Sequence, residues 1–119
     1  MMAKQMVMEP TAAQRLAVAQ DGLRRLQAES AAADWRKAAA QAQLDELNGK
    51  LAALQRAQDV RGEDVAAALL TVQEQRTEAA RQVSIASATK SELAGRMEVV
   101  RRDLPALEAA ALQDELAAA

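Results

Sequence analysis

Residues 59–64, with the sequence DVRGED, decide the fold because they interrupt a chain that consists mainly of good helix formers. Elsewhere in residues 11–119 the only helix breakers are three isolated glycines and Pro105. Gly62 has no side chain to oppose the left-handed conformation that ends many helices, and Asp64 is suited to cap the helix that follows. The sequence therefore predicts one helix on each side of this stretch.

Residues on both sides of this stretch follow alternating spacings of three and four, which is typical of a coiled-coil seam. The alternation changes phase across residues 59–64, and a continuous coiled coil seldom changes phase at a glycine flanked by acids. We expect the seam of the first helix to contain Leu16, Ala19, Leu23, Leu26, Ser30, Ala33, Lys37, Ala40, Leu44, Leu47, Leu51 and Leu54. In the second helix we expect Val65, Leu69, Val72, Arg76, Ala79, Val83, Ala86, Lys90, Leu93, Met97, Val100, Leu104, Leu107 and Ala111.

A reversal of the chain at the interruption gives the two seams a common register. Because both helices rise by the same amount per residue, facing residues must have numbers with a constant sum. With a sum of 123, large side chains mostly face small or flexible ones, and Leu51 faces Val72. Half of this sum falls between Arg61 and Gly62, at the interruption itself. We therefore predict an all-α, elongated, antiparallel two-helix coiled-coil hairpin. The alternatives are one uninterrupted helix, or two helices that pair only with other chains.

The first helix is expected to begin at Thr11. Pro10 disfavours helix before it, and Thr11 and Gln14 have the spacing of a capping box. We predict a mobile N-terminal segment over 1–10 and a single hairpin over 11–119, with helices over 11–61 and 64–117 and a turn over 61–64.

Composition argues against an enzyme. The chain of 119 residues has no cysteine and no histidine, and one tryptophan is its only aromatic residue. Without an imidazole or a thiol it has no Ser-His or Cys-His nucleophile pair, no zinc site of the usual His/Cys type and no disulfide. The adjacent carboxylates are best explained as solvated helix faces and caps. We expect no catalytic residue, no cofactor and no metal.

Charge and hydropathy narrow the choice of partner. The net charge of −2 disfavours nucleic acid, and no apolar stretch is long enough to insert into a membrane, which requires ~20 residues. The first eight residues lack the continuous apolar core and cleavage site of a secretory signal. We therefore expect a cytoplasmic protein whose partners are proteins, with a homo-oligomer as one option.

Trp35 is the strongest candidate for partner binding. In the predicted register it lies on the outward face of the first helix, and tryptophan is strongly enriched at binding hot spots. The alternative is a tryptophan lying flat on its own helix, since single exposed apolar residues need no explanation. Six alanines are predicted to share this face, and all but Ala38 are included in the predicted partner-binding set: Ala28, Ala31, Ala32, Ala38, Ala39 and Ala42.

Three cations, Lys37, Arg76 and Lys90, fall at seam positions. Long aliphatic stems allow such side chains to reach water from the edge of a narrow interface. The other interpretation is a weak middle region that opens or accepts a third helix. Because Trp35 lies in the same stretch, we include Lys37 and Lys90 among the predicted partner-binding residues.

The architecture of residues 11–119, a short Ala/Arg/Gln/Leu/Glu-rich hairpin, resembles the stalk proteins of type III secretion and flagellar export, the FliJ/YscO type. The resemblance rests on no diagnostic motif. It implies a central rod in a bacterial export apparatus that engages a hexameric export ATPase and contacts the export gate or escort chaperones. The alternative function is a structural coiled-coil module that self-assembles into a helical bundle.

Overall fold

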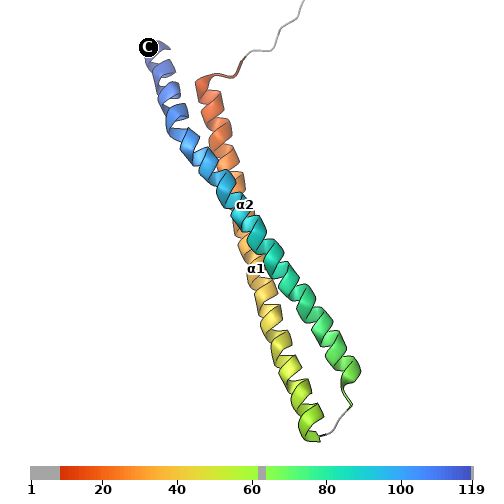
Figure 1. Ribbon diagram of the computed structural model, residues 1–119. Helices are drawn as coiled ribbons and strands as arrows, with labels where there is room; N and C mark the ends of the chain where they lie inside the picture. The colour runs from red at the N-terminus through yellow and green to blue at the C-terminus, as the bar shows by residue number, and fades with distance from the viewer. Residues whose placement is uncertain (1–8, 62–63, 119) are drawn as a thin grey trace, which may run out of the picture. The chain divides into compact units, whose positions relative to one another are not determined.

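The computed structural model describes residues 9–61 and 64–118, and nearly all of them are helical. Helix α1 spans Ala12–Arg61 and helix α2 spans Ala66–Ala118 (Figure 1). No strand occurs among these residues. Helix α2 continues through Pro105, although a proline within a helix removes one backbone hydrogen bond.

The start of α1 is a capping box, as predicted. The backbone N–H of Gln14 donates to Thr11 Oγ1 at 3.1 Å, and the backbone N–H of Thr11 donates to Gln14 Oε1 at 2.8 Å. The Arg15 N–H donates to the Thr11 carbonyl at 2.9 Å, which makes Thr11 the N-cap residue and Ala12 the first helical residue. Two backbone donors at the helix end therefore have partners.

Helix α2 begins at Ala66, two residues later than predicted. The Leu69 N–H donates to the Val65 carbonyl at 2.8 Å, so the first helical hydrogen bond starts there. Asp64 Oδ1 accepts the Ala66 N–H at 3.3 Å, so the expected cap of this helix is confirmed. The expected conformation of Gly62 lies outside the described residues, as do residues 1–8 of the predicted N-terminal segment.

The described residues divide into two compact units, each made of one segment of α1 and one of α2. The unit nearer the turn covers Ser30–Glu92. Its core cluster contains Leu47, Val72 and Ala79, and the partly buried Leu44, Leu51 and Leu54 of α1 pack against it. Late residues of α1 thus contact early residues of α2, as an antiparallel hairpin requires.

The other unit joins the described residues up to Glu29 with those from Leu93 onward. Its buried side chains are Ala12, Leu93, Met97 and Ala111. The seam residues of α1 in this unit are half-buried. Two alanines and two larger apolar side chains are therefore buried where its two segments pack together.

The predicted seam is confirmed almost completely by the burial of side chains. Every predicted seam residue of α1 is buried or half-buried, and in α2 Arg76 alone of the predicted seam residues is exposed. The exposure of Arg76 agrees with the interpretation in which a long aliphatic stem carries the cation from a seam position to water. The all-α antiparallel hairpin is therefore the observed fold in both units.

Candidate interaction surface

Trp35 lies on the face of α1 opposite the seam, with 78% of its surface exposed. Two nearby seam residues, Ala33 and Ala40, are buried at 0% and 7% exposure. A residue two positions after Ala33 is rotated by about 200° around the helix axis and must point away from α2. The hairpin therefore packs without using its largest apolar side chain.

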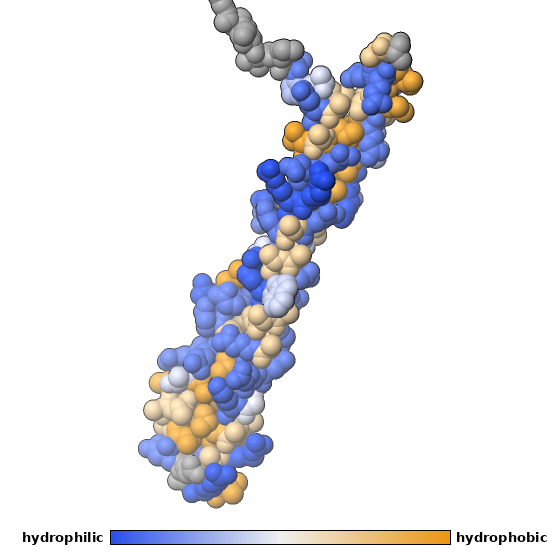
Figure 2. Space-filling view, turned by 180° about the vertical axis from the view of Figure 1, so that it is seen from behind, coloured by the Kyte–Doolittle hydropathy of each residue, from blue (hydrophilic) through white to orange (hydrophobic). Residues whose placement is uncertain are grey.

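The alanines predicted to accompany Trp35 are all exposed. Ala31, Ala32, Ala39 and Ala42 lie one or two turns from Trp35 along α1 in the unit nearer the turn. Ala28 is also exposed and belongs to the other unit. Figure 2 shows light-orange apolar side chains between blue hydrophilic ones on one side of the molecule.

Charged side chains of α1 form ordered pairs in each unit. On α1, Arg25 Nη2 lies 3.0 Å from Asp21 Oδ2, and Lys50 Nζ lies 3.5 Å from Glu46 Oε1. Both are i,i+4 pairs with side chains at least half exposed. Pairs of this kind are worth only a few tenths of a kcal/mol, roughly 0.3–0.5, so a partner's charges compete with them easily.

The two seam lysines behave differently. Lys37 is half-buried, as expected for a long side chain at the edge of the seam. Lys90 Nζ forms an ion pair with Asp34 Oδ1, across the two helices. The sequence interpretation missed Asp34, although the predicted register places Lys90 opposite Ala33, the neighbour of Asp34. The structure therefore brings Lys90 next to the residue that precedes Trp35.

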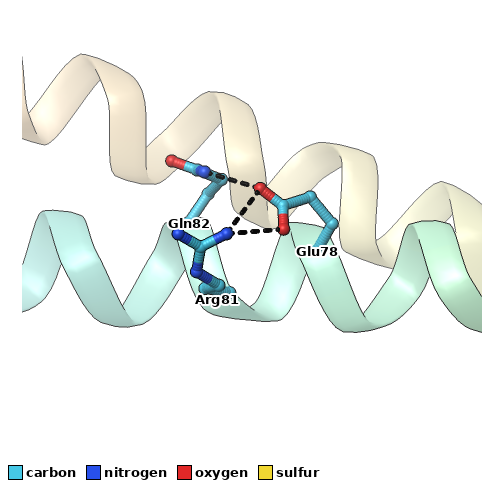
Figure 3. A network of polar contacts seen from close by, with 3 residues as sticks. All are labelled: Glu78, Arg81 and Gln82. Carbon is cyan, nitrogen blue, oxygen red and sulfur yellow. Dashed lines mark hydrogen bonds and ion pairs between the residues drawn. The ribbon is translucent and has the colours of Figure 1, made fainter.

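The outer surface of α2 carries a separate polar cluster. Glu78 accepts hydrogen bonds from Gln82 Nε2 at 2.8 Å and from Arg81 Nη1 at 3.1 Å (Figure 3). The hydrogen bond from Gln82, followed by that from Arg81 and its positive charge, lowers the pKa of the Glu78 carboxyl below its ordinary value. A carboxylate held ionised on an open surface is suited to helix stabilisation and not to proton transfer.

A shallow hollow lies near the end of α1. Its lining residues are Ala53, Arg56, Ala57, Val60 and Arg61, and all come from this one helix. In the described part of the chain, no group of three or more acidic residues is arranged to hold a metal ion. No described helix combines the length and the apolar character needed to cross a bilayer.

Comparison with known proteins gives no relative. No protein-family model matches the chain, no curated protein is similar to it in sequence, and no solved structure matches its fold.

The structure brings part of the predicted partner-binding set together. Trp35 and the exposed alanines lie along one face of α1, as their helical spacing requires. Lys37 and Lys90 lie at the opposite seam, where Lys90 is engaged by Asp34. We define the Trp35 face as Trp35 with Ala31, Ala32, Ala39 and Ala42.

Proposed function

We propose that this chain is a non-enzymatic coiled-coil interaction protein that binds its partner through the Trp35 face. The observation that carries the proposal is the 78% exposure of Trp35 beside a seam that is already filled. Burying an aromatic side chain removes on the order of 200 Å² from water, at about 25 cal/mol per Å². A protein partner is the ligand that covers a flat apolar surface with charged borders.

The finer proposal is a stalk or regulator subunit of a bacterial type III export ATPase, acting in the cytoplasm. Its support is architectural: an antiparallel helical hairpin with a filled seam resembles the FliJ/YscO stalk proteins. In this proposal the hexameric ATPase engages the hairpin, and the export gate or escort chaperones contact it elsewhere. Lys37 and Lys90 remain in the predicted binding set, at the edge of the seam.

The experiment measures binding to a purified export ATPase encoded in the same genome, by sedimentation and by ATP hydrolysis. Trp35→Ala should weaken the association at least tenfold and leave helical circular dichroism unchanged. The matched control is Leu70→Ala, which removes an exposed apolar side chain from α2, 58% exposed, and should bind normally. Equal binding by both variants would contradict the role of the Trp35 face.

A self-assembling coiled-coil module is the second candidate function. The arrangement of charges along α1 favours it, because the two i,i+4 pairs lie at similar distances on the two sides of Trp35. Light scattering of the pure chain separates the candidates. A stalk is a monomer that binds the ATPase, whereas a self-assembling module is a dimer or larger without any other protein.

A further inference from the structure

The sequence of α1 is partly self-complementary about Trp35. Within eleven residues of Trp35, seven pairs of positions outside the seam match at equal distances before and after it, whereas Glu29 and Gln41 do not. Ala33 and Lys37 in the seam, and Asp21 and Gly49 farther out, do not match either. Four of the seven matching pairs are apolar or amide and identical: Ala32 and Ala38, Ala31 and Ala39, Ala28 and Ala42, Gln27 and Gln43. The other three matching pairs are charged and opposite in sign: Asp34 and Arg36, Arg25 and Asp45, Arg24 and Glu46.

This pattern fits a second copy of the same helix running in the opposite direction. A two-fold axis beside Trp35 exchanges each position with its counterpart on the other copy. Small apolar side chains then meet small apolar side chains, and positive charges lie at the level of negative ones. In a parallel, in-register pair each charged side chain would face the same side chain of the other copy, and the repulsion between like charges is unfavourable.

We infer that the Trp35 face is the interface of a two-fold symmetric dimer in which α1 of one chain packs antiparallel against α1 of another, centred on Trp35. The inference rests on the second candidate function, the self-assembling module, and it identifies the partner at the Trp35 face as a second copy of the chain. The seam of α1 lies on the opposite side of the helix and is occupied by α2. Dimerisation therefore leaves the hairpin intact.

Charges at the two ends of the interface define the register. Arg24 and Glu46 each lie eleven residues from Trp35 along the sequence, which is about three turns of an α-helix. In both i,i+4 pairs of α1 the acid precedes the base: Asp21 with Arg25 and Glu46 with Lys50. Antiparallel packing places Arg24 of one copy opposite Glu46 of the other, and Asp21 beside Lys50. The symmetry repeats these contacts at the other end.

Alanines around the centre make room for the two tryptophans. Helix axes pack about 8–10 Å apart, according to the side chains at the contact. Because two tryptophans meet at the centre, we expect a spacing at the upper end of this range, with the indole of Trp35 over Ala31 and Ala39 of the other copy. Both indoles are removed from water, and this apolar contact supplies affinity. The charged side chains favour the antiparallel over the parallel orientation of the two helices.

The first test reverses a charge and then restores it. Sedimentation equilibrium of the full chain should show a dimer that weakens as salt rises, because its borders are charged. Glu46→Arg should raise the dissociation constant on the order of tenfold, and Arg24→Glu combined with Glu46→Arg should return it to within about threefold of the original. Glu74→Arg on α2 is the matched control, since Glu74 is exposed and lies outside the interface. Circular dichroism confirms that all variants are equally helical.

The second test uses the absence of cysteine from the chain. A mixture of chains carrying Ala31→Cys with chains carrying Ala39→Cys should form a mixed disulfide under mild oxidation. Either variant alone should cross-link much less. A preference of Ala31→Cys for itself would indicate a parallel dimer and overturn the inference.

The outcomes separate this inference from the proposed function. A chain that is monomeric at all concentrations, yet binds a heterologous partner that Trp35→Ala loses, overturns the dimer and leaves the proposed function standing. If the dimer forms equally well in Trp35→Ala and in Glu46→Arg, the Trp35 face is not the dimer interface and the inference is overturned. If Trp35→Ala also binds a heterologous partner as well as the original chain does, the proposed function is overturned too.

Discussion

Lys90 of α2 forms an ion pair with Asp34 of α1, the residue directly before Trp35. The contact crosses between the helices near the middle of the chain's two long segments. Lys90, which was predicted at a seam position, therefore contacts a residue at the edge of the Trp35 face. The two side chains are 37% and 57% exposed, so water screens the attraction.

The Lys90–Asp34 pair should contribute about 0.5 kcal/mol to the free energy of unfolding, because it is partly solvated. A double-mutant cycle with Lys90→Ala and Asp34→Ala measures the coupling, which should fall as salt increases. The control cycle replaces Asp34→Ala by Asp45→Ala, an exposed acid on the same helix. Equal couplings in the two cycles would show that the pair has no specific effect.

Cysteines at Leu51 and Val72 should form a disulfide within one chain. Leu51 packs against the cluster that contains Val72, and their numbers satisfy the predicted register. Gel electrophoresis without reductant measures the product, which should be independent of protein concentration. The control chain carries cysteines at Leu51 and Leu70, since Leu70 is exposed on α2. Products that are only intermolecular would show that the pairing is wrong.

Leu47→Ala should destabilise the hairpin by about 2 kcal/mol, near the lower end of the range for buried leucines. Leu47 is 4% exposed and packs in the cluster with Val72 and Ala79. A two-helix core has few side chains around the cavity that the substitution leaves. The surrounding side chains can therefore partly fill the cavity, which limits the loss of stability. Urea unfolding followed by circular dichroism measures the change. Leu70→Ala, at an exposed position, should cost less than about 0.5 kcal/mol; a similar loss in both variants would contradict the assigned core.

The pKa of Glu78 should rise toward its ordinary value in Gln82→Ala, because the largest cause of its lowering is the hydrogen bond from Gln82. A carboxyl whose pKa is lowered in the folded state stabilises the fold above its unfolded pKa. This contribution is lost as pH falls through the folded pKa. NMR titration of the Glu78 side chain measures the shift. Gln75→Ala, one turn before on α2, is the control; an unchanged pKa in Gln82→Ala would contradict the assigned cause.

The sequence by itself determined the two helices, their caps and their register. Heptad spacing selects which side chains face a partner helix, and equal rise along both helices makes the register a matter of counting. Thr11 with Gln14 and Asp64 with Ala66 show the caps that their spacing predicts. The helices and caps depend on residues close together in the sequence, and the register follows from the constant sum 123 of facing residue numbers. None of these features requires knowledge of three-dimensional packing.

The tertiary structure decided where the long charged side chains go. Arg76 and Lys90 occupy equivalent positions in the seam pattern, yet Arg76 is exposed and Lys90 is paired with Asp34. Spacing along one helix does not determine this difference, because the end of a flexible side chain responds to the rotation of the neighbouring helix and to the charges it presents. The same geometry leaves Trp35 outside a seam that its neighbours Ala33 and Ala40 close.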